Sequence, residues 1–222
     1  MTILVNGAGE PTPRILVAVP CGTSVDAYFA QDLALMFAYT TYVKPDMEVL
    51  SFFARGTYLP RARAALVNKA VEKNCTHILW LDTDMRFPKD TLLRLLSHGK
   101  HVVAANYSTR QAPIIPIAVD EEKRPIFESA ELKEARSAPM GVMMTQIDVF
   151  LAMPKPYFAI GYAKAIDDYS PEDSFFCELA RKHNYEIWID GELSEQVRHV
   201  GTFEYEMGHA RMTRDAAQPE ES

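Results

Sequence analysis

The chain has 222 residues, of which 48% are hydrophobic and 24% are charged, as is ordinary for one globular domain with a sizeable core. Its formal net charge of −7 argues against a general attraction to nucleic acid or to an anionic membrane, and leaves room only for a local basic groove. Cys21, Cys75 and Cys177 are odd in number and lack CxxC spacing, which favours free thiols in a reducing compartment over a disulfide framework or a zinc site. Residues 1–13 lack a signal-peptide pattern, and no apolar run approaches the ~18 residues of a membrane span, so we expect a cytoplasmic protein without such a span.

The first half of the chain alternates between strand patterns and helix patterns. Arg14–Pro20 is a β-branched run that a proline stops, and a helix is expected over Asp26–Val43 with Thr23 or Ser24 as its cap. The following patterns predict strands at Val49–Phe53, His77–Leu81 and His101–Ala105, with helices at Ala62–Lys73 and at Lys89–Ser97, the latter opened by Pro88 and closed by Gly99. This alternation predicts the α/β class, with a mostly parallel sheet and helices on both of its faces.

The second half is less regular. A hairpin-like antiparallel excursion is expected from Ile114–Val119, a polar turn at Asp120–Pro125, and Ile126–Glu131. Further strands are expected at Gly141–Met144 and Ile187–Ile189, helices at Ile147–Met153 and Pro171–His183, and an extended segment at Val197–Gly201. Pro154–Ser170 is expected to be a long loop, and loops of this length often act as lids. We interpret residues 14–207 as a single domain, after an irregular lead-in (1–13) and before a flexible tail (208–222).

Two carboxylates one residue apart, Asp82 and Asp84, directly follow the apolar run His77–Leu81. In parallel sheets, ligands bind beyond the carboxyl ends of the strands, and oxygen ligands there suit a divalent cation beside a polyphosphate. Aspartate is also a favoured turn residue, so the motif alone is equally compatible with an ordinary polar turn.

Other motifs accompany this one in order along the chain. Ala62-Arg63 opens the helix before the strand that ends in Asp82-Thr83-Asp84, Glu172-Asp173 lies at the start of a later helix, and Ile187–Asp190 precedes His199-Val200-Gly201. From about Ile15 to Gly201 the chain resembles the GT-A glycosyltransferases, including the family 2 type and small phage and bacterial members with an Asp-x-Asp motif. The resemblance implies one Rossmann-like GT-A domain, with a nucleotide-sugar-binding half at 14–107 and an acceptor and catalytic half at 108–207.

The resemblance also implies a Mn²⁺ or Mg²⁺ ion that neutralises charge on the departing diphosphate. Asp84 would coordinate the ion directly, and Asp82 would contact the ribose or a metal-bound water, although the two roles could be exchanged. His199 would be a third ligand. The structural alternative is a histidine that is simply satisfied near a strand end.

The acidic pair at the start of the later helix corresponds to the general base of inverting members, with Asp173 as the first choice and Glu172 as the second. On spacing alone, Asp173 falls where a capping-box acid lies if Ser170 is the N-cap and Pro171 the first helical residue. A retaining enzyme would not need this base.

Residues expected to bind the donor follow the first strand, flank the acidic motif or carry a guanidinium: Pro20, Gly22, Thr23, Arg63, Asp82, Thr83 and Arg110. Gly22 would permit close backbone approach, and Arg110 suits a diphosphate or an acceptor. A plain strand-to-helix turn and solvated arginines are the structural alternatives. Trp80 and Trp188 lie within strands, where core packing is expected rather than sugar stacking.

We therefore predict a metal-dependent glycosyltransferase that moves a sugar from a UDP- or GDP-linked donor to a hydroxyl of a glycan, a protein or a modified DNA base. It would act in the cytoplasm, which is the host's if a phage encodes it. A nucleotidyltransferase is less favoured, because Pro20–Ser24 lacks a glycine-rich phosphate loop with a basic residue. A non-catalytic nucleotide-sugar-binding module is the third interpretation, because a fold does not determine a function.

Overall fold

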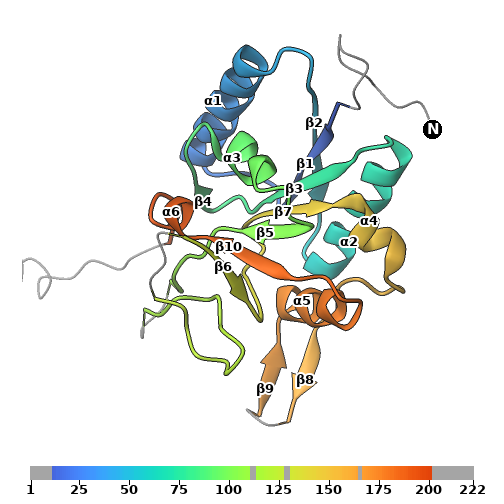
Figure 1. Cartoon of the computed structure of the whole chain (residues 1–222), viewed down its shortest axis with the longest axis vertical. Coiled ribbons are helices and arrows are strands. Elements are labelled where there is room, and N and C mark those ends of the chain that lie inside the picture. Colours follow the sequence, from blue (N-terminus) through green and yellow to red (C-terminus); the bar gives the residue numbers. More distant parts are fainter. Residues whose placement is uncertain (1–11, 111–113, 128–130, 165–166, 202–222) are drawn as a thin grey trace, which may run out of the picture.

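A seven-stranded sheet forms the centre of the computed structural model, which describes residues 12–110, 114–127, 131–164 and 167–201 (Figure 1). Its strands lie in the order β2 (Glu48–Arg55), β1 (Arg14–Cys21), β3 (His77–Leu81), β7 (Val142–Gln146), β5 (Val102–Ala104), β10 (Ile187–Asp190) and β6 (Leu132–Ala135). β2, β1 and β3 are parallel neighbours, as are β5 and β10, whereas β7 and β6 run antiparallel to the strands beside them. The predicted α/β class with a mostly parallel sheet is confirmed.

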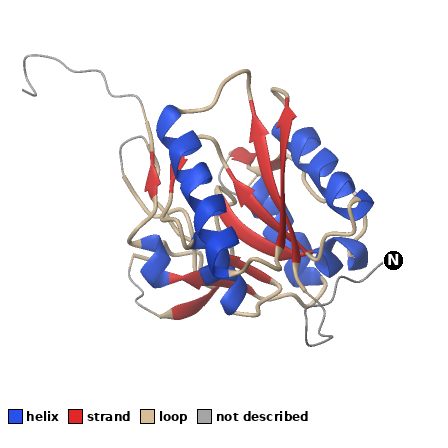
Figure 2. Ribbon diagram, turned by 90° about the horizontal axis from the view of Figure 1, so that it is seen from above, coloured by secondary structure: helices blue, strands red, loops and turns tan. Residues whose placement is uncertain are grey.

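Helices cover both faces of this sheet (Figure 2). α1 (Ala27–Val43), α3 (Thr91–Ser97) and the short α6 (Gly191–Ser194) pack on one face, and α2 (Leu59–Glu72), α4 (Ile147–Ala152) and α5 (Glu172–Lys182) pack on the other. Two cores result because side chains alternate along each strand. In β3, the fully buried Ile78 and Trp80 belong to the core beneath α2, α4 and α5, and the fully buried Leu79 and Leu81 to the core beneath α1 and α3.

Both tryptophans pack in the cores, as predicted. The Nε1–H of Trp80 donates to Oγ1 of Thr145 at 3.1 Å, so its polar atom is satisfied inside the core. Trp188 is half-buried against the other core, and the ammonium of Lys100 lies 3.7 Å from the centroid of its ring. Trp80 is therefore not available to stack on a sugar, and the ring of Trp188 already packs against the core and Lys100.

Two small antiparallel pairs lie outside the central sheet: β4 (Met85–Arg86) with β11 (Arg198–His199), and β8 (Gly161–Ala163) with β9 (Asp168–Ser170). The segment Pro154–Ser170 thus contains a β-hairpin, and the expectation of a loop without strands was wrong. The turn at Asp120–Pro125 does close a hairpin-like excursion, as expected, because the N–H of Ile126 donates to the carbonyl of Ala118 at 2.9 Å. Residues 128–130 of the expected arm Ile126–Glu131 lie outside the described residues.

Helix α1 is capped by a residue other than the two expected. Oδ1 of Asp26 accepts hydrogen bonds from the N–H groups of Tyr28 at 2.8 Å and Phe29 at 3.3 Å. Thr23 and Ser24 are exposed turn residues before this cap. The prediction was wrong because the turn after β1 is longer than a minimal strand-to-helix connection.

Helix α3 begins two residues later than predicted. Pro88 lies before the helix rather than at its first position, and its carbonyl accepts from the hydroxyl of Thr91 at 2.7 Å. Gly99 adopts a φ of +62° just after the helix, in the left-handed region that glycine reaches without strain, and so ends it as expected.

Cys21, Cys75 and Cys177 are free thiols, as predicted, and the last two are buried. Within the described ranges, no helix combines the length and the apolar character that crossing a membrane requires. Most of the expected lead-in and all of the expected tail lie outside the described residues.

Candidate active site

A cleft of about 420 Å³ lies where β1, β2 and β3 end, at the carboxyl edge of the sheet. Parallel strands place the segments that follow them at one edge, where α/β proteins bind ligands. The cleft is lined by Pro20, Cys21, Gly22, Gly56, Thr57, Leu59, Arg63, Asp82, Thr83, Asp84, Tyr107, Arg110, Ile117, Glu172, Asp173 and His199. The structure therefore brings together the residues predicted from sequence, with the exception of Thr23.

Sequence reasoning missed six residues of this lining: Cys21, Gly56, Thr57, Leu59, Tyr107 and Ile117. Gly56 and Thr57 follow β2, whose parallel register with β1 sets Arg55 beside Cys21, and the N–H of Gly56 donates to the carbonyl of Cys21 at 3.0 Å. Gly56 lies three residues beyond the end of the predicted strand Val49–Phe53, and a glycine so close to a parallel strand end could have indicated this contribution. Tyr107 had no comparable sequence signal, because its place in the cleft depends on contacts that form only when the chain folds.

Arg63, on α2, holds two of the carboxylates of the cleft. Its Nη2 donates to both oxygens of Asp82 at 3.0 and 3.2 Å, and its Nε donates to Oε1 of Glu172 at 3.0 Å. Arg63 is only 1% exposed, which shows that it is not a solvated helix-start arginine. Burial lowers the pKa of its guanidinium, but the neighbouring carboxylates outweigh burial and leave the pKa raised. Arg63 is therefore a permanent buried cation that fixes the orientation of Asp82 and Glu172.

Asp84 belongs to a second ionic group. Nη1 of Arg110 lies 2.6 Å from Oδ2 of Asp84, and Nε2 of His199 lies 3.5 Å from the same oxygen. The pairing of β11 with β4 produces this contact, because it sets His199 opposite Met85, the residue after Asp84. Nδ1 of His199 lies 2.9 Å from the carbonyl oxygen of Ser108, which can only accept, so Nδ1 carries a proton and Nε2 faces the carboxylate.

The two aspartates of the motif differ in their electrostatic surroundings. Burial raises the pKa of Asp82, and the nearby charge of Arg63 only partly opposes this effect. Burial would also raise the pKa of Asp84, but the contact with His199 and the charge of Arg110 outweigh it and lower the pKa. For His199, burial lowers the pKa, whereas Asp84 and the carbonyl of Ser108 raise it, with a net rise. Asp84 is thus the more readily ionised aspartate.

The donor set around Asp84 fits a divalent cation in part. In a neutral His199, Nε2 is an acceptor that faces the acceptor Oδ2 of Asp84, and a proton or a cation between them satisfies both. The cleft lining holds four carboxyl groups and two arginines, so its charge also favours a cation. No group of three metal-ligating side chains comes together in the described part of the chain. Asp84 and His199 therefore offer two ligands to an ion, and its remaining ligands would have to come from a bound molecule or from water.

Asp173 lies at the start of α5, but not in a capping box. The helix begins at Glu172 with Pro171 as its N-cap, so Ser170 is not the cap and the capping-box interpretation was wrong. Oδ1 of Asp173 accepts from the N–H of Ser174 at 2.6 Å. This leaves the second carboxylate oxygen available to the cleft.

The two acids of α5 differ in their pairing. Glu172 is buried and bound to Arg63, whereas no ion pair within the described ranges holds Asp173. Burial, followed by the nearby charge of Glu172, raises the pKa of Asp173 to about 6. A carboxylate that titrates near pH 6, is therefore mostly ionised at neutral pH, and forms no ion pair with the described residues has the properties of a general base.

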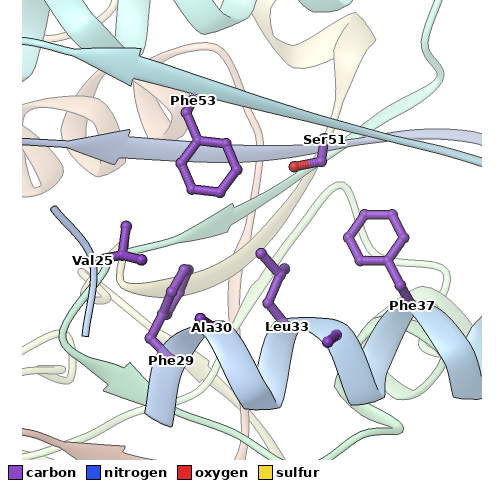
Figure 3. A pocket seen from close by; sticks show the side chains of 8 residues that line it. Val25, Phe29, Ala30, Leu33, Phe37, Ser51 and Phe53 are labelled. Atoms are coloured by element: carbon purple, nitrogen blue, oxygen red, sulfur yellow. The ribbon is translucent and has the colours of Figure 1, made fainter. Parts of the chain in front are cut away.

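A second cavity, of about 370 Å³, lies between α1 and the edge strand β2 (Figure 3). It is lined by Val25, Phe29, Ala30, Leu33, Ala34, Phe37, Ser51 and Phe53. None of these side chains titrates, and only Ser51 is polar. This cavity therefore lacks the groups that acid–base or metal chemistry requires, which distinguishes it from the cleft of similar size at the strand ends.

No protein-family model matches this chain, and no curated protein matches its sequence. Among solved structures, the crystal structure of A197 from STIV is similar to it, with a TM-score of 0.56 and 15% sequence identity. The match covers 86% of this chain and 98% of A197. At this identity the similarity shows a shared α/β fold, and the chemistry of the cleft must be argued from its residues.

Proposed function

We propose that this protein is a metal-dependent glycosyltransferase of the GT-A type, which transfers a sugar from a nucleotide-diphosphate donor to an acceptor hydroxyl with inversion. The observation that carries the proposal is the combination of two features in one cleft. One is Asp173, a carboxylate that forms no ion pair with the residues the structure describes and whose pKa is about 6. The other is the pair of Asp84 and His199, in which a neutral imidazole would turn an acceptor atom towards the carboxylate, as a divalent cation requires.

On the donor side, bound Mn²⁺ or Mg²⁺ would supply Lewis acidity that neutralises the charge developing on the diphosphate. Asp84 and His199 would hold the ion. Arg110, whose side chain is 47% exposed, would release Asp84 and bind the diphosphate instead, because guanidinium–phosphate hydrogen bonds are strong and bidentate. Gly22, with nothing within 4 Å of an added Cβ, leaves open backbone for the nucleoside beside Pro20.

On the acceptor side, Asp173 would remove the proton from the acceptor hydroxyl as its oxygen bonds to the anomeric carbon. The bond from that carbon to the diphosphate oxygen breaks, and its electron pair leaves with the diphosphate. Glu172, held by Arg63, is a positioning residue in this scheme, because its fixed negative charge raises the pKa of Asp173. This arrangement favours Asp173 over Glu172 as the base.

A thermal-shift screen tests the donor side with UDP, GDP and their sugar conjugates, each with and without Mn²⁺ or Mg²⁺. We expect a shift that needs both nucleotide and cation and that Asp84→Asn abolishes. Asp120→Asn is the matched control, because Asp120 also pairs with an arginine, Arg124, at 2.8 Å, but lies outside the cleft lining. An unchanged shift in Asp84→Asn would disprove the cation site, and the absence of any response to nucleotide would disprove the donor site.

A transfer assay then separates an enzyme from a binding module. Asp173→Asn should keep the nucleotide-dependent shift and lose sugar transfer, because the substitution removes the base and not the donor contacts. A variant that retained full transfer would show that Asp173 is not the base. Nucleotide binding without cleavage of any donor would identify a non-catalytic module instead.

A further inference from the structure

The hairpin of β8 and β9 presents a pair of exposed aromatic side chains. Tyr162 and Tyr169 lie opposite each other in its register, with ring centroids 5.6 Å apart and an interplanar angle of 75°. Tyr162 is 53% exposed and Tyr169 is 67% exposed. Single exposed apolar residues are common and need no explanation, whereas these two rings pack on each other and form one exposed aromatic surface.

This hairpin joins α5 directly (Figure 1), and the first two residues of α5, Glu172 and Asp173, line the cleft. β9 ends at Ser170 and α5 begins at Glu172, so only three residues separate Tyr169 from Asp173. Four fully extended residue steps span at most about 14 Å, which limits the distance between the Cα atoms of Tyr169 and Asp173. A molecule of a few sugar rings that rests on the tyrosines could therefore reach the proposed base.

Charge around the pair selects the class of ligand. Asp167 and Asp168 precede Tyr169, and the hydroxyl of Tyr162 donates a hydrogen bond to the carboxylate of Asp167. Between residues 161 and 170 the sequence has one cation, Lys164, and the acidic start of α5 follows. This surface repels a polyanion such as DNA, which needs phosphate-binding cations. Carboxylates instead accept hydrogen bonds from hydroxyl groups, and aromatic faces pack against the apolar C–H faces of pyranose rings.

We propose that Tyr162 and Tyr169 form an acceptor subsite for a neutral oligosaccharide. The inference rests on the proposed glycosyltransferase function and makes its acceptor a glycan rather than a modified DNA base. The hydrogen bond from Tyr162 to Asp167 holds one ring in place, and the more exposed ring of Tyr169 provides the stacking face.

Saturation-transfer NMR on the full chain without donor tests the subsite directly. The probes are maltotetraose, cellotetraose and chitotetraose, with a single-stranded DNA octamer as the anionic comparison. We expect saturation transfer to the ring protons of at least one of the sugars. Tyr169→Ala should weaken its binding about fivefold, because one aromatic contact is lost. Tyr169→Phe should retain binding, since the ring remains.

The control variant is Tyr42→Ala, which removes an 86% exposed tyrosine from α1, on the opposite face of the sheet from α5, and should leave sugar binding unchanged. The subsite is refuted if no sugar binds, if Tyr169→Ala binds as the wild type does, or if the DNA binds more tightly than every sugar. The nucleotide and cation thermal shift on the same variants should not change. A normal thermal shift with nucleotide but no sugar binding would refute only the subsite. Sugar binding through Tyr169 without any thermal response to nucleotide would refute the donor function.

Discussion

The raised pKa of Asp173 predicts that removing its charge stabilises the protein. The ordinary pKa of aspartate is 3.8, and in the folded protein that of Asp173 is about 6. Because the folded pKa is raised, this carboxyl stabilises the fold below pH 3.8, and the contribution is lost as the pH rises through 6. Above pH 6, the folded protein with the ionised carboxylate is less stable by roughly 3 kcal/mol than it would be with an uncharged group of the same shape, at ~1.4 kcal/mol per pKa unit. Asp173→Asn keeps the shape and an oxygen for the N–H of Ser174.

Unfolding by urea and by heat should be followed for the wild type and Asp173→Asn between pH 4 and pH 8. We expect a small difference at pH 4, an advantage for the variant that grows between pH 4 and pH 6, and a plateau above pH 6 of at most about 3 kcal/mol. For a chain of this size, that limit corresponds to a rise in Tm of roughly 6–12 °C.

The matched control for this experiment is Asp148→Asn. Asp148 lies in the first turn of α4, and its Oδ1 accepts from the N–H of Val149 at 2.8 Å, which copies the local contact of Asp173. Its side chain is 52% exposed, so its replacement should give no comparable gain. If Asp173→Asn were less stable than the wild type at pH 7.5, or if the difference did not depend on pH, the account of a buried, unpaired carboxylate would be refuted.

Two further substitutions test the contacts around the cation site. Arg110→Gln should tighten Mn²⁺ binding without nucleotide by up to about fivefold, because an exposed ion pair worth ~1 kcal/mol at most no longer competes for Asp84. Relaxation of water protons in a Mn²⁺ titration measures this affinity, and an unchanged value would show that guanidinium and cation do not compete. Gly141→Ala should lower the free energy of unfolding by about 1–3 kcal/mol, because the added Cβ would overlap the hydroxyl of Tyr107. Gly161→Ala, with nothing within 4 Å of its added Cβ, is the control, and equal urea midpoints for the two variants would contradict this reasoning.

Most helices and strands of the central fold could be predicted because their patterns are local. The order of strand and helix through β5 predicts the parallel arrangement, since a helical crossover brings the next strand back in the same direction. The position of β7 could not be predicted in this way. It lies antiparallel between β3 and β5, and a strand's partners depend on contacts between residues far apart in the chain.

The hairpin of β8 and β9 shows a second limit of local patterns. Each of its strands has only three residues, too few for an alternating pattern to stand out from a polar loop. The aromatic pair of Tyr162 and Tyr169 exists only because the two strands align in register. The surface that we propose as the acceptor subsite therefore could not be predicted from the sequence, because it depends on how the two strands pair.

The sequence by itself determined which chemical groups this protein has at its site: two aspartates after a buried strand, an acidic pair at a helix start, and arginines and a histidine in reach of them. Only the tertiary structure decided which of these groups pair with one another. Arg63 binds Glu172 across 109 positions of sequence and also binds Asp82. Asp84 pairs instead with Arg110 and His199, and Asp173 is left without an ion pair in the described part of the chain. The physical reason is that the pKa and the available lone pairs of a carboxylate depend on its burial and its neighbours, and these arise only when the chain has folded.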